Sequence, residues 1–307
     1  METRIVSLIA SATEIVCALG YEHLLVGRSH ECDYPASILK LPPCSEPRID
    51  VSGSSAQIDQ DVRETVKQVL SVYSVFEDHL DRLRPTIIIT QAQCDVCAVN
   101  VRDVEAAIAE VTDFAPQVVS LVPMELADIW TDIRQVAQAI GDKAAGEKLI
   151  ASLQTRLSEI REENTSDEPK PSILCVEWME PLMSAANWMP ELVDIAGGTA
   201  VLCESGQHSG YITWEDVQKA DPDVIAIMPC GFDVERCQQE IHLLTERPGW
   251  SQLRAAKNDR VFITDGNQYF NRPGPRVVES AQILAELLHD RISAQPDPPR
   301  YGRLSNR

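Results

Sequence analysis

Short apolar runs alternate with longer segments of helical periodicity along most of the chain. Several of these runs have the length and the β-branched content of buried strands. They cover residues 4–11, 24–29, 85–90 and 117–122 in the first half, and residues 172–178, 223–229 and 260–266 in the second. Strands that alternate with helices indicate parallel sheets covered by helices on both faces. The sequence therefore predicts an α/β protein built from two doubly wound lobes.

Helical periodicity occupies the intervals between these strands. A helix over residues 12–20 closes at Gly20, because glycine readily takes the left-handed conformation that ends a helix. Further helical patterns cover residues 61–83, residues 126–140, residues near 190–196 and residues from about 276 to 289.

A long amphipathic pattern separates the two halves. Residues 142–164 place apolar side chains at helical spacing, and a helix of about twenty residues spans roughly 30 Å, enough to bridge two domains. We therefore expect four segments. They are an N-terminal α/β lobe at residues 1–141, a linker helix at 142–165, a C-terminal α/β lobe at 166–292 and a disordered, Pro-rich tail at 293–307.

Five sequence patterns together carry a resemblance to a known family. They are "RIVSLIASATEIVCALG" with "LVGRSHECDYP", then "IGDKAAGEKL", "WMPELVDIAGG", "ITWEDVQKADPDVIAI" and "GWSQLRAAKNDRVFITDG". Over residues 4–291 the chain resembles the solute-binding proteins of ABC importers in the cobalamin and iron-siderophore group, above all those labelled cobalamin-binding. The resemblance implies two lobes joined by one long α-helix, with limited closure and a ligand cleft between the lobes. It also implies non-catalytic binding of a macrocyclic ligand, cobalamin or a related corrinoid, and an ABC permease as the partner of exported members.

Charge excludes some classes of partner. The formal net charge is −20, so the phosphates of nucleic acids and the surface of an anionic membrane would repel the protein. No stretch of about eighteen apolar residues occurs, and we expect no membrane insertion.

The first twenty residues do not have the pattern of an export signal. Glu2 stands beside Arg4, Glu14 interrupts the apolar stretch, and Val16 is bulky where a cleavage site needs small residues. We therefore expect a cytoplasmic protein whose nine cysteines are reduced thiols. Cys17 and Cys175 lie within element patterns and are expected in the core.

Candidate binding residues follow the predicted strands, because ligands of open α/β sheets bind beyond the carboxyl ends of the strands. The aromatic members of this set could stack on a large flat or ring-like ligand. Packing under long loops would explain each of them equally well. The candidate ligand-binding residues are Ser11, Thr13, His30, Glu31, Cys32, Gln93, Cys94, Trp178, Trp188, Tyr211, Cys230, Phe232, Tyr269 and Arg272.

The segment "CDVC" leaves four interpretations open. Cys94 and Cys97 could pack as small apolar residues, form a redox dithiol, touch a ligand, or hold a metal ion together with Cys32 and His30. Ligand contact includes soft ligation of a metal inside a cofactor. The candidate metal ligands are Cys94, Cys32 and His30, so a bound metal ion stays among the expected cofactors beside the corrinoid.

Two further segments could receive an anionic group. "SAT" at residues 11–13 opens the first helix, whose backbone N–H groups could bind phosphate or carboxylate, or the segment could be a plain cap. Arg272, in the turn "NRPGPR", could reach an anion, or the turn could be purely structural.

Catalytic motifs are lacking in the sequence. It contains no G-x-S-x-G, H-E-x-x-H, Walker A or G-x-G-x-x-G pattern. A Cys–His pair, either Cys32 with His30 or Cys94 with His208, could still meet in space. We expect a protein that is not an enzyme. The alternatives are a cytoplasmic binder of a metal ion or metal chelate (haem or siderophore) and a thiol-dependent enzyme.

Overall fold

A computed structural model describes residues 2–68, 72–92, 99, 101–110, 115–294, 296 and 298–304 of the chain. The chain divides into two compact units. The N-terminal unit comprises Met1–Gly53, Gln57–Pro123 and Ala127–Ser152, and the C-terminal unit comprises Ser54–Ala56, Met124–Leu126 and Leu153–Arg307. The division falls within the longest helix, α6 (Lys143–Asn164), which follows α5 (Leu126–Ile140).

The N-terminal unit is built on a four-stranded parallel sheet with the order β2-β1-β5-β6. Its strands are β1 (Ile5–Ser7), β2 (Leu25–Arg28), β5 (Ile87–Gln91) and β6 (Gln117–Leu121). All four strand predictions of this half are confirmed. The predicted first strand is shorter than expected because α1 already begins at Ala10.

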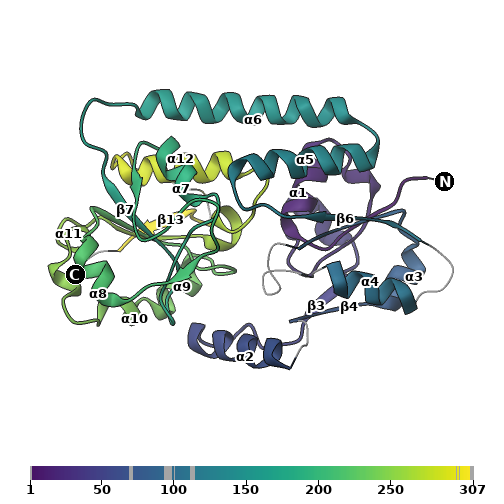
Figure 1. The fold of residues 1–307 in the computed structure, drawn as a ribbon, viewed down its shortest axis with the longest axis horizontal. Coiled ribbons are helices and arrows are strands. Elements are labelled where there is room, and N and C mark those ends of the chain that lie inside the picture. Colours follow the sequence, from purple (N-terminus) through teal and green to yellow (C-terminus); the bar gives the residue numbers. More distant parts are fainter. Residues whose placement is uncertain are drawn as a thin grey trace. The chain divides into compact units, whose positions relative to one another are not determined.

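Helices cover both faces of this sheet, as the alternating pattern predicts. Figure 1 shows α1 (Ala10–Ala18) and α5 on one face, and α3 (Glu77–Leu83) and α4 (Val101–Glu110) on the other. Val6 and Ile88 of the sheet pack with Leu80 of α3 and Val104 of α4 in one buried cluster. Burial of such side chains contributes roughly 1.5–3 kcal/mol each and accounts for the helix positions.

A second, antiparallel sheet in this unit was not expected from the sequence. Its two strands are β3 (Ser45–Pro47) and β4 (Tyr73–Val75). The prediction of helix throughout residues 61–83 is wrong, because α2 (Ser55–Lys67) ends before β4 and α3 begins after it. Two short 3₁₀ helices, Glu22–Leu24 and Ala36–Lys40, flank β2.

The C-terminal unit contains a seven-stranded sheet with the order β10-β8-β7-β11-β12-β13, in which β9 also pairs with β7. The parallel core of β7, β11 and β12 confirms the three predicted strands of this half. The strands are β7 (Ser172–Trp178), β8 (Met183–Ser184), β9 (Thr199–Ala200), β10 (Gly210–Tyr211), β11 (Val224–Ile227), β12 (Val261–Thr264) and β13 (Tyr301–Arg303).

The helices of this unit lie on both sides of its sheet. In Figure 1, α7 and α12 lie above the sheet, and α8, α9 and α10 lie on its other side. The helices are α7 (Met189–Ile195), α8 (Trp214–Ala220), α9 (Val234–Glu240), α10 (His242–Thr245), a 3₁₀ turn η3 (Trp250–Gln252), α11 (Arg254–Lys257), a π-helical turn η4 (Gly266–Phe270) and α12 (Val277–Leu288).

The carboxyl-terminal segment corrects the prediction of a disordered tail. Tyr301–Arg303 form β13, which pairs antiparallel with β12. Tyr301 is buried, and its hydroxyl donates to Glu286 Oε2 at 2.7 Å. Composition alone predicted disorder because the preceding segment is Pro-rich, whereas one buried aromatic residue and an open strand edge suffice to order these residues.

Candidate functional site

A buried polar cluster lies beyond the carboxyl ends of β1 and β2. The Thr13 side chain hydrogen-bonds to Ser7 Oγ at 2.8 Å and to Cys32 Sγ at 3.0 Å. Thr13, Ser7 and Cys32 have no exposed surface. The Cys32 thiol, expected to contact ligand or metal, therefore packs against α1 in this structure, because a small uncharged thiol is readily buried.

His30 lies half-buried beside this cluster. Its Nδ1 is 3.0 Å from Ser45 Oγ, and its ring lies 5.3 Å from that of Tyr73. The Ser45 hydroxyl also lies 3.1 Å from Ser29 Oγ, which is itself 3.4 Å from the His30 Nδ1. Burial is the main cause that lowers the pKa of His30, which keeps the ring neutral at pH 7. Tyr73 also donates to Glu31 Oε1 at 3.3 Å.

The metal hypothesis gains no geometric support from the described part of the chain. There, no group of three or more His, Cys, Asp or Glu side chains is arranged to hold a metal ion. Gln93, Cys94 and Cys97 lie outside the described residues, so the interpretations of "CDVC" stay predictions.

An aromatic group follows the central strands of the C-terminal unit. Trp178 is the last residue of β7, and Phe232 lies in the loop between β11 and α9. Their ring centroids are 5.3 Å apart, and the guanidinium of Arg236 lies 4.4 Å above the Phe232 ring. A 2.5 Å ion pair with Glu240 holds Arg236 in this position. Arg236 was not among the residues predicted from the sequence, because its place over the Phe232 ring depends on the path of the loop before α9.

A second group follows β12. Asp265 is the N-cap of the π-helical turn η4, which carries Tyr269, and Arg272 follows this turn. Arg272 is 5% exposed and donates to Asn267 Oδ1 at 3.0 Å. Burial raises the pKa of Tyr269, whose ring lies 5.5 Å from the guanidinium of Arg276. Arg276 was also missed, because it falls where the helical pattern begins.

The remaining candidates are scattered. Trp188 is 6% exposed at the start of α7 and belongs to the core, whereas Tyr211 is 62% exposed on the edge strand β10. Cys230 is half-buried before the turn at Gly231. Ser11, in the first turn of α1, is buried, and its Oγ has no partner among the described residues. Ligand contacts through these residues stay predictions.

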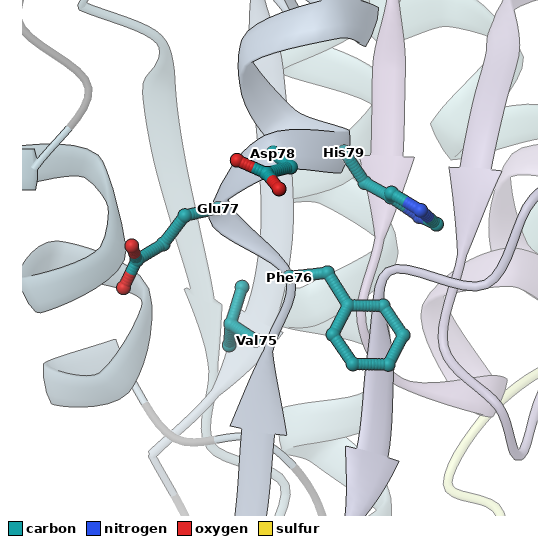
Figure 2. Close-up of a pocket in the computed structure, with 5 residues that line it drawn as sticks. All are labelled: Val75, Phe76, Glu77, Asp78 and His79. Atoms are coloured by element: carbon teal, nitrogen blue, oxygen red, sulfur yellow. The ribbon is translucent and has the colours of Figure 1, made fainter.

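A surface pocket of about 500 Å³ lies in the N-terminal unit. Figure 2 shows the Glu77, Asp78 and His79 side chains around it, with Val75 and Phe76 beside them. The Nδ1 of His79 is 2.6 Å from the carbonyl oxygen of Pro43. All lining residues come from one continuous segment, and none of them is a predicted ligand-binding residue.

Several known proteins are similar to this chain over nearly its whole length. An uncharacterized ABC transporter substrate-binding lipoprotein of Bacillus subtilis is 22% identical over 93% of this chain and 80% of its own length. A vitamin B12-binding protein of Photorhabdus laumondii is 22% identical over 94% of this chain and 88% of its own. The crystal structure of a periplasmic heme-binding protein from Pseudomonas aeruginosa superposes with a TM-score of 0.72 at 18% identity, covering 100% and 99% of the two chains.

These relatives overturn the expected compartment. The prediction of a cytoplasmic protein is wrong, because the similar proteins are named as a lipoprotein and as periplasmic proteins. The prediction rested on the residue pattern of the first twenty positions, which is weaker evidence than similarity over the whole fold. Among the described residues, no helix is long and apolar enough to cross a membrane.

The match to a family model agrees with the two α/β units and with the sequence resemblance. The model described as "Periplasmic binding protein" matches residues 5–268, which include the sheets of both units except β13. This chain belongs to the periplasmic binding protein family.

Proposed function

We propose that this chain is the substrate-binding protein of an ABC transporter, that it delivers its ligand to an ABC permease, and that the ligand is a corrinoid of the cobalamin class. The relatives named as vitamin B12-binding proteins support this proposal, since they align over more than nine-tenths of the chain. Corrinoids and haems are both broad macrocycles with a bound metal and a polar periphery. Both therefore need an apolar surface with a few polar groups at its edge.

One observation carries the proposal. Trp178, Phe232 and Arg236 contact one another where ligands of parallel sheets bind, at the carboxyl ends of β7 and β11, with the two rings tilted by 56° and the guanidinium over the Phe232 ring. Aromatic faces bind flat rings through dispersion and apolar burial, and a guanidinium stacked on a ring adds a donor to the same surface. Trp178 is half-buried, so part of its side chain is exposed and could contact a ligand.

Titration with cyanocobalamin tests the proposal. We expect the ligand to quench intrinsic tryptophan fluorescence and to co-elute with the protein, which the visible corrin absorption detects. Trp178→Ala should weaken binding about 10- to 100-fold, since one stacked aromatic side chain contributes roughly 1–3 kcal/mol.

A matched control comes from the same unit. Trp214 stacks on Trp250 with centroids 6.2 Å apart, and its indole N–H donates to the carbonyl oxygen of Pro248. Trp214→Ala should leave the affinity for cyanocobalamin unchanged. If the protein bound hemin but not cyanocobalamin, the ligand would be a haem rather than a corrinoid. If Trp178→Ala bound cyanocobalamin with unchanged affinity, the aromatic group would not be part of the binding site.

A further inference from the structure

One buried carboxylate contacts two of the groups around the Trp178–Phe232 pair. Glu240 is the last residue of α9 and is 5% exposed. Its Oε1 accepts from Arg236 Nη2 at 2.5 Å, and the Arg236 guanidinium lies over the Phe232 ring. Its two oxygens also accept the backbone N–H of Ser55, at 3.1 and 3.0 Å. Glu240 therefore joins a side chain of its own helix to a backbone segment that is distant in the sequence.

Ser55 in turn contacts Trp178. It is fully buried as the first residue of α2, and Ser54–Ala56 belong to the C-terminal unit. The indole N–H of Trp178 donates to the Ser55 carbonyl oxygen at 3.2 Å. An indole has one donor and no acceptor. The single donor of Trp178 is thus used within the protein, and its ring is the part that can contact a ligand.

The surroundings of Glu240 stabilise its negative charge. The first N–H groups of a helix have no partner within the helix, and the helix dipole favours a negative charge beside them. Burial alone would raise the pKa of Glu240, but the hydrogen bonds from Ser55 and the charge of Arg236 outweigh burial and lower this pKa. Glu240 is therefore ionised at neutral pH, and it can accept from both donors at once.

We infer that Glu240 is a positioning residue of the ligand site, which fixes the Trp178 ring through Ser55 and the Arg236 guanidinium directly. This inference rests on the proposed function, because it concerns the affinity of the same site. A surface that is already ordered loses less side-chain entropy when a ligand binds, so its affinity is higher. Because Glu240 is almost fully buried, it acts through these two groups rather than by touching the ligand.

Glu240→Ala tests this role with cyanocobalamin as the probe. The variant loses the shared acceptor, and we expect its affinity to fall about tenfold. Glu240→Gln keeps the size of the side chain and one acceptor oxygen, so its affinity should fall by about threefold or less. In the Trp178→Ala background, Glu240→Ala should lower the affinity by only about threefold, because substitutions of residues that act through one another are not additive.

A second glutamate of the same unit provides the matched control. Glu191 Oε2 accepts the backbone N–H of Leu126, the first residue of α5, at 2.7 Å. Glu191→Ala therefore removes the same kind of contact from another helix. It should lower stability in urea unfolding and leave the affinity for cyanocobalamin unchanged. An equal loss of affinity in Glu191→Ala and Glu240→Ala would mean that Glu240 acts only through general stability, and would overturn the inference.

The ligand-free protein gives a readout that does not depend on the proposed function. In NMR spectra of isotope-labelled protein, the indole N–H signal of Trp178 is identified by its loss in Trp178→Ala. Glu240→Ala should move this signal toward that of an indole in water, whereas Glu191→Ala should leave it in place. An unmoved signal or an unchanged affinity in Glu240→Ala would overturn the positioning role. Failure of the wild-type protein to bind cyanocobalamin would instead overturn the proposed function, and with it any role of Glu240 in binding.

Discussion

Burial sets the chemistry of several individual side chains in this protein. It raises the pKa of Cys17 to about 12 and that of Cys44 to about 11, so both are protonated thiols at neutral pH. The thiolate is the form that attacks disulfides and binds metals. Both thiols therefore carry little thiolate at neutral pH, a property that depends on their surroundings and that cysteine spacing in a sequence cannot reveal.

Asp132 on α5 shows how the same effect makes stability depend on pH. It is 2% exposed, its Oδ1 accepts the backbone N–H of Val122 at 3.4 Å, and its Oδ2 has no partner within the described structure. Burial raises its pKa from 3.8 to about 7. The folded state therefore holds the proton that the unfolded state releases above about pH 4, and stability falls as pH rises from there to about 7.

The measurement compares Asp132→Asn with the wild-type protein in urea unfolding, followed by circular dichroism, from pH 4.5 to 8. We expect the variant to gain relative stability with rising pH, by about 3 kcal/mol between pH 4.5 and 8. Asp81→Asn is the control, because its side chain is 62% exposed in the same unit. A stability difference that stays constant with pH would contradict the raised pKa of Asp132.

At the scale of secondary-structure elements, the sequence predicts the strands that are formed by long runs of apolar residues. The parallel strands β5, β7 and β11 are continuous apolar runs, because both of their faces are buried. The two-residue and three-residue strands β3, β8 and β13 have no such pattern, since pairing with a neighbouring edge fixes them rather than their own residues. The three-residue strand β4 also lacks an apolar run of its own, so it could not be recognised within the helical pattern over residues 61–83.

Truncation tests the role of β13. A chain that ends at residue 298 lacks Tyr301, which is 3% exposed, and the two donors to Glu286 supplied by Arg300 and Tyr301. It also exposes the edge of β12. We expect the C-terminal unit to lose about 3–5 kcal/mol of stability in urea unfolding, because a buried aromatic residue and buried hydrogen bonds are removed together.

The control for this truncation is a chain that ends at Leu304 and retains all of β13. It should unfold at the urea concentration of the full chain. If both truncated chains were equally stable, β13 would contribute nothing to the C-terminal unit.

At the scale of the whole molecule, the sequence predicted the class of fold, whereas the location of the binding site and its residues stay predictions. Strand ends can be located from apolar runs, and Trp178, Phe232 and Arg272 follow from that rule. Arg236 and Arg276 were missed because each lies against an aromatic ring outside its own helix, Phe232 before α9 and Tyr269 in η4. Trp188, another predicted ligand-binding residue, is 6% exposed at the start of α7, because an aromatic residue at a helix start packs inward as readily as outward.

The last prediction concerns how the two units unfold. Each has its own sheet and core, so calorimetry of the ligand-free protein should show two transitions, with a van't Hoff enthalpy below the calorimetric one. Trp130 is in the N-terminal unit and the other four tryptophans are in the C-terminal unit. Fluorescence of Trp130→Phe therefore follows the C-terminal unit alone, and circular dichroism follows both.

The same calorimetry with cyanocobalamin added should then show which of the two units bind the ligand. At about 100 times its dissociation constant it should stabilise the folded state by about 2.7 kcal/mol. If residues of both units contact the ligand, both transitions should rise and approach each other, because unfolding of either unit releases it. If only the transition that Trp130→Phe fluorescence follows moved to a higher temperature, the ligand would bind to the C-terminal unit alone. Ser11, His30 and Glu31 would then not belong to the site.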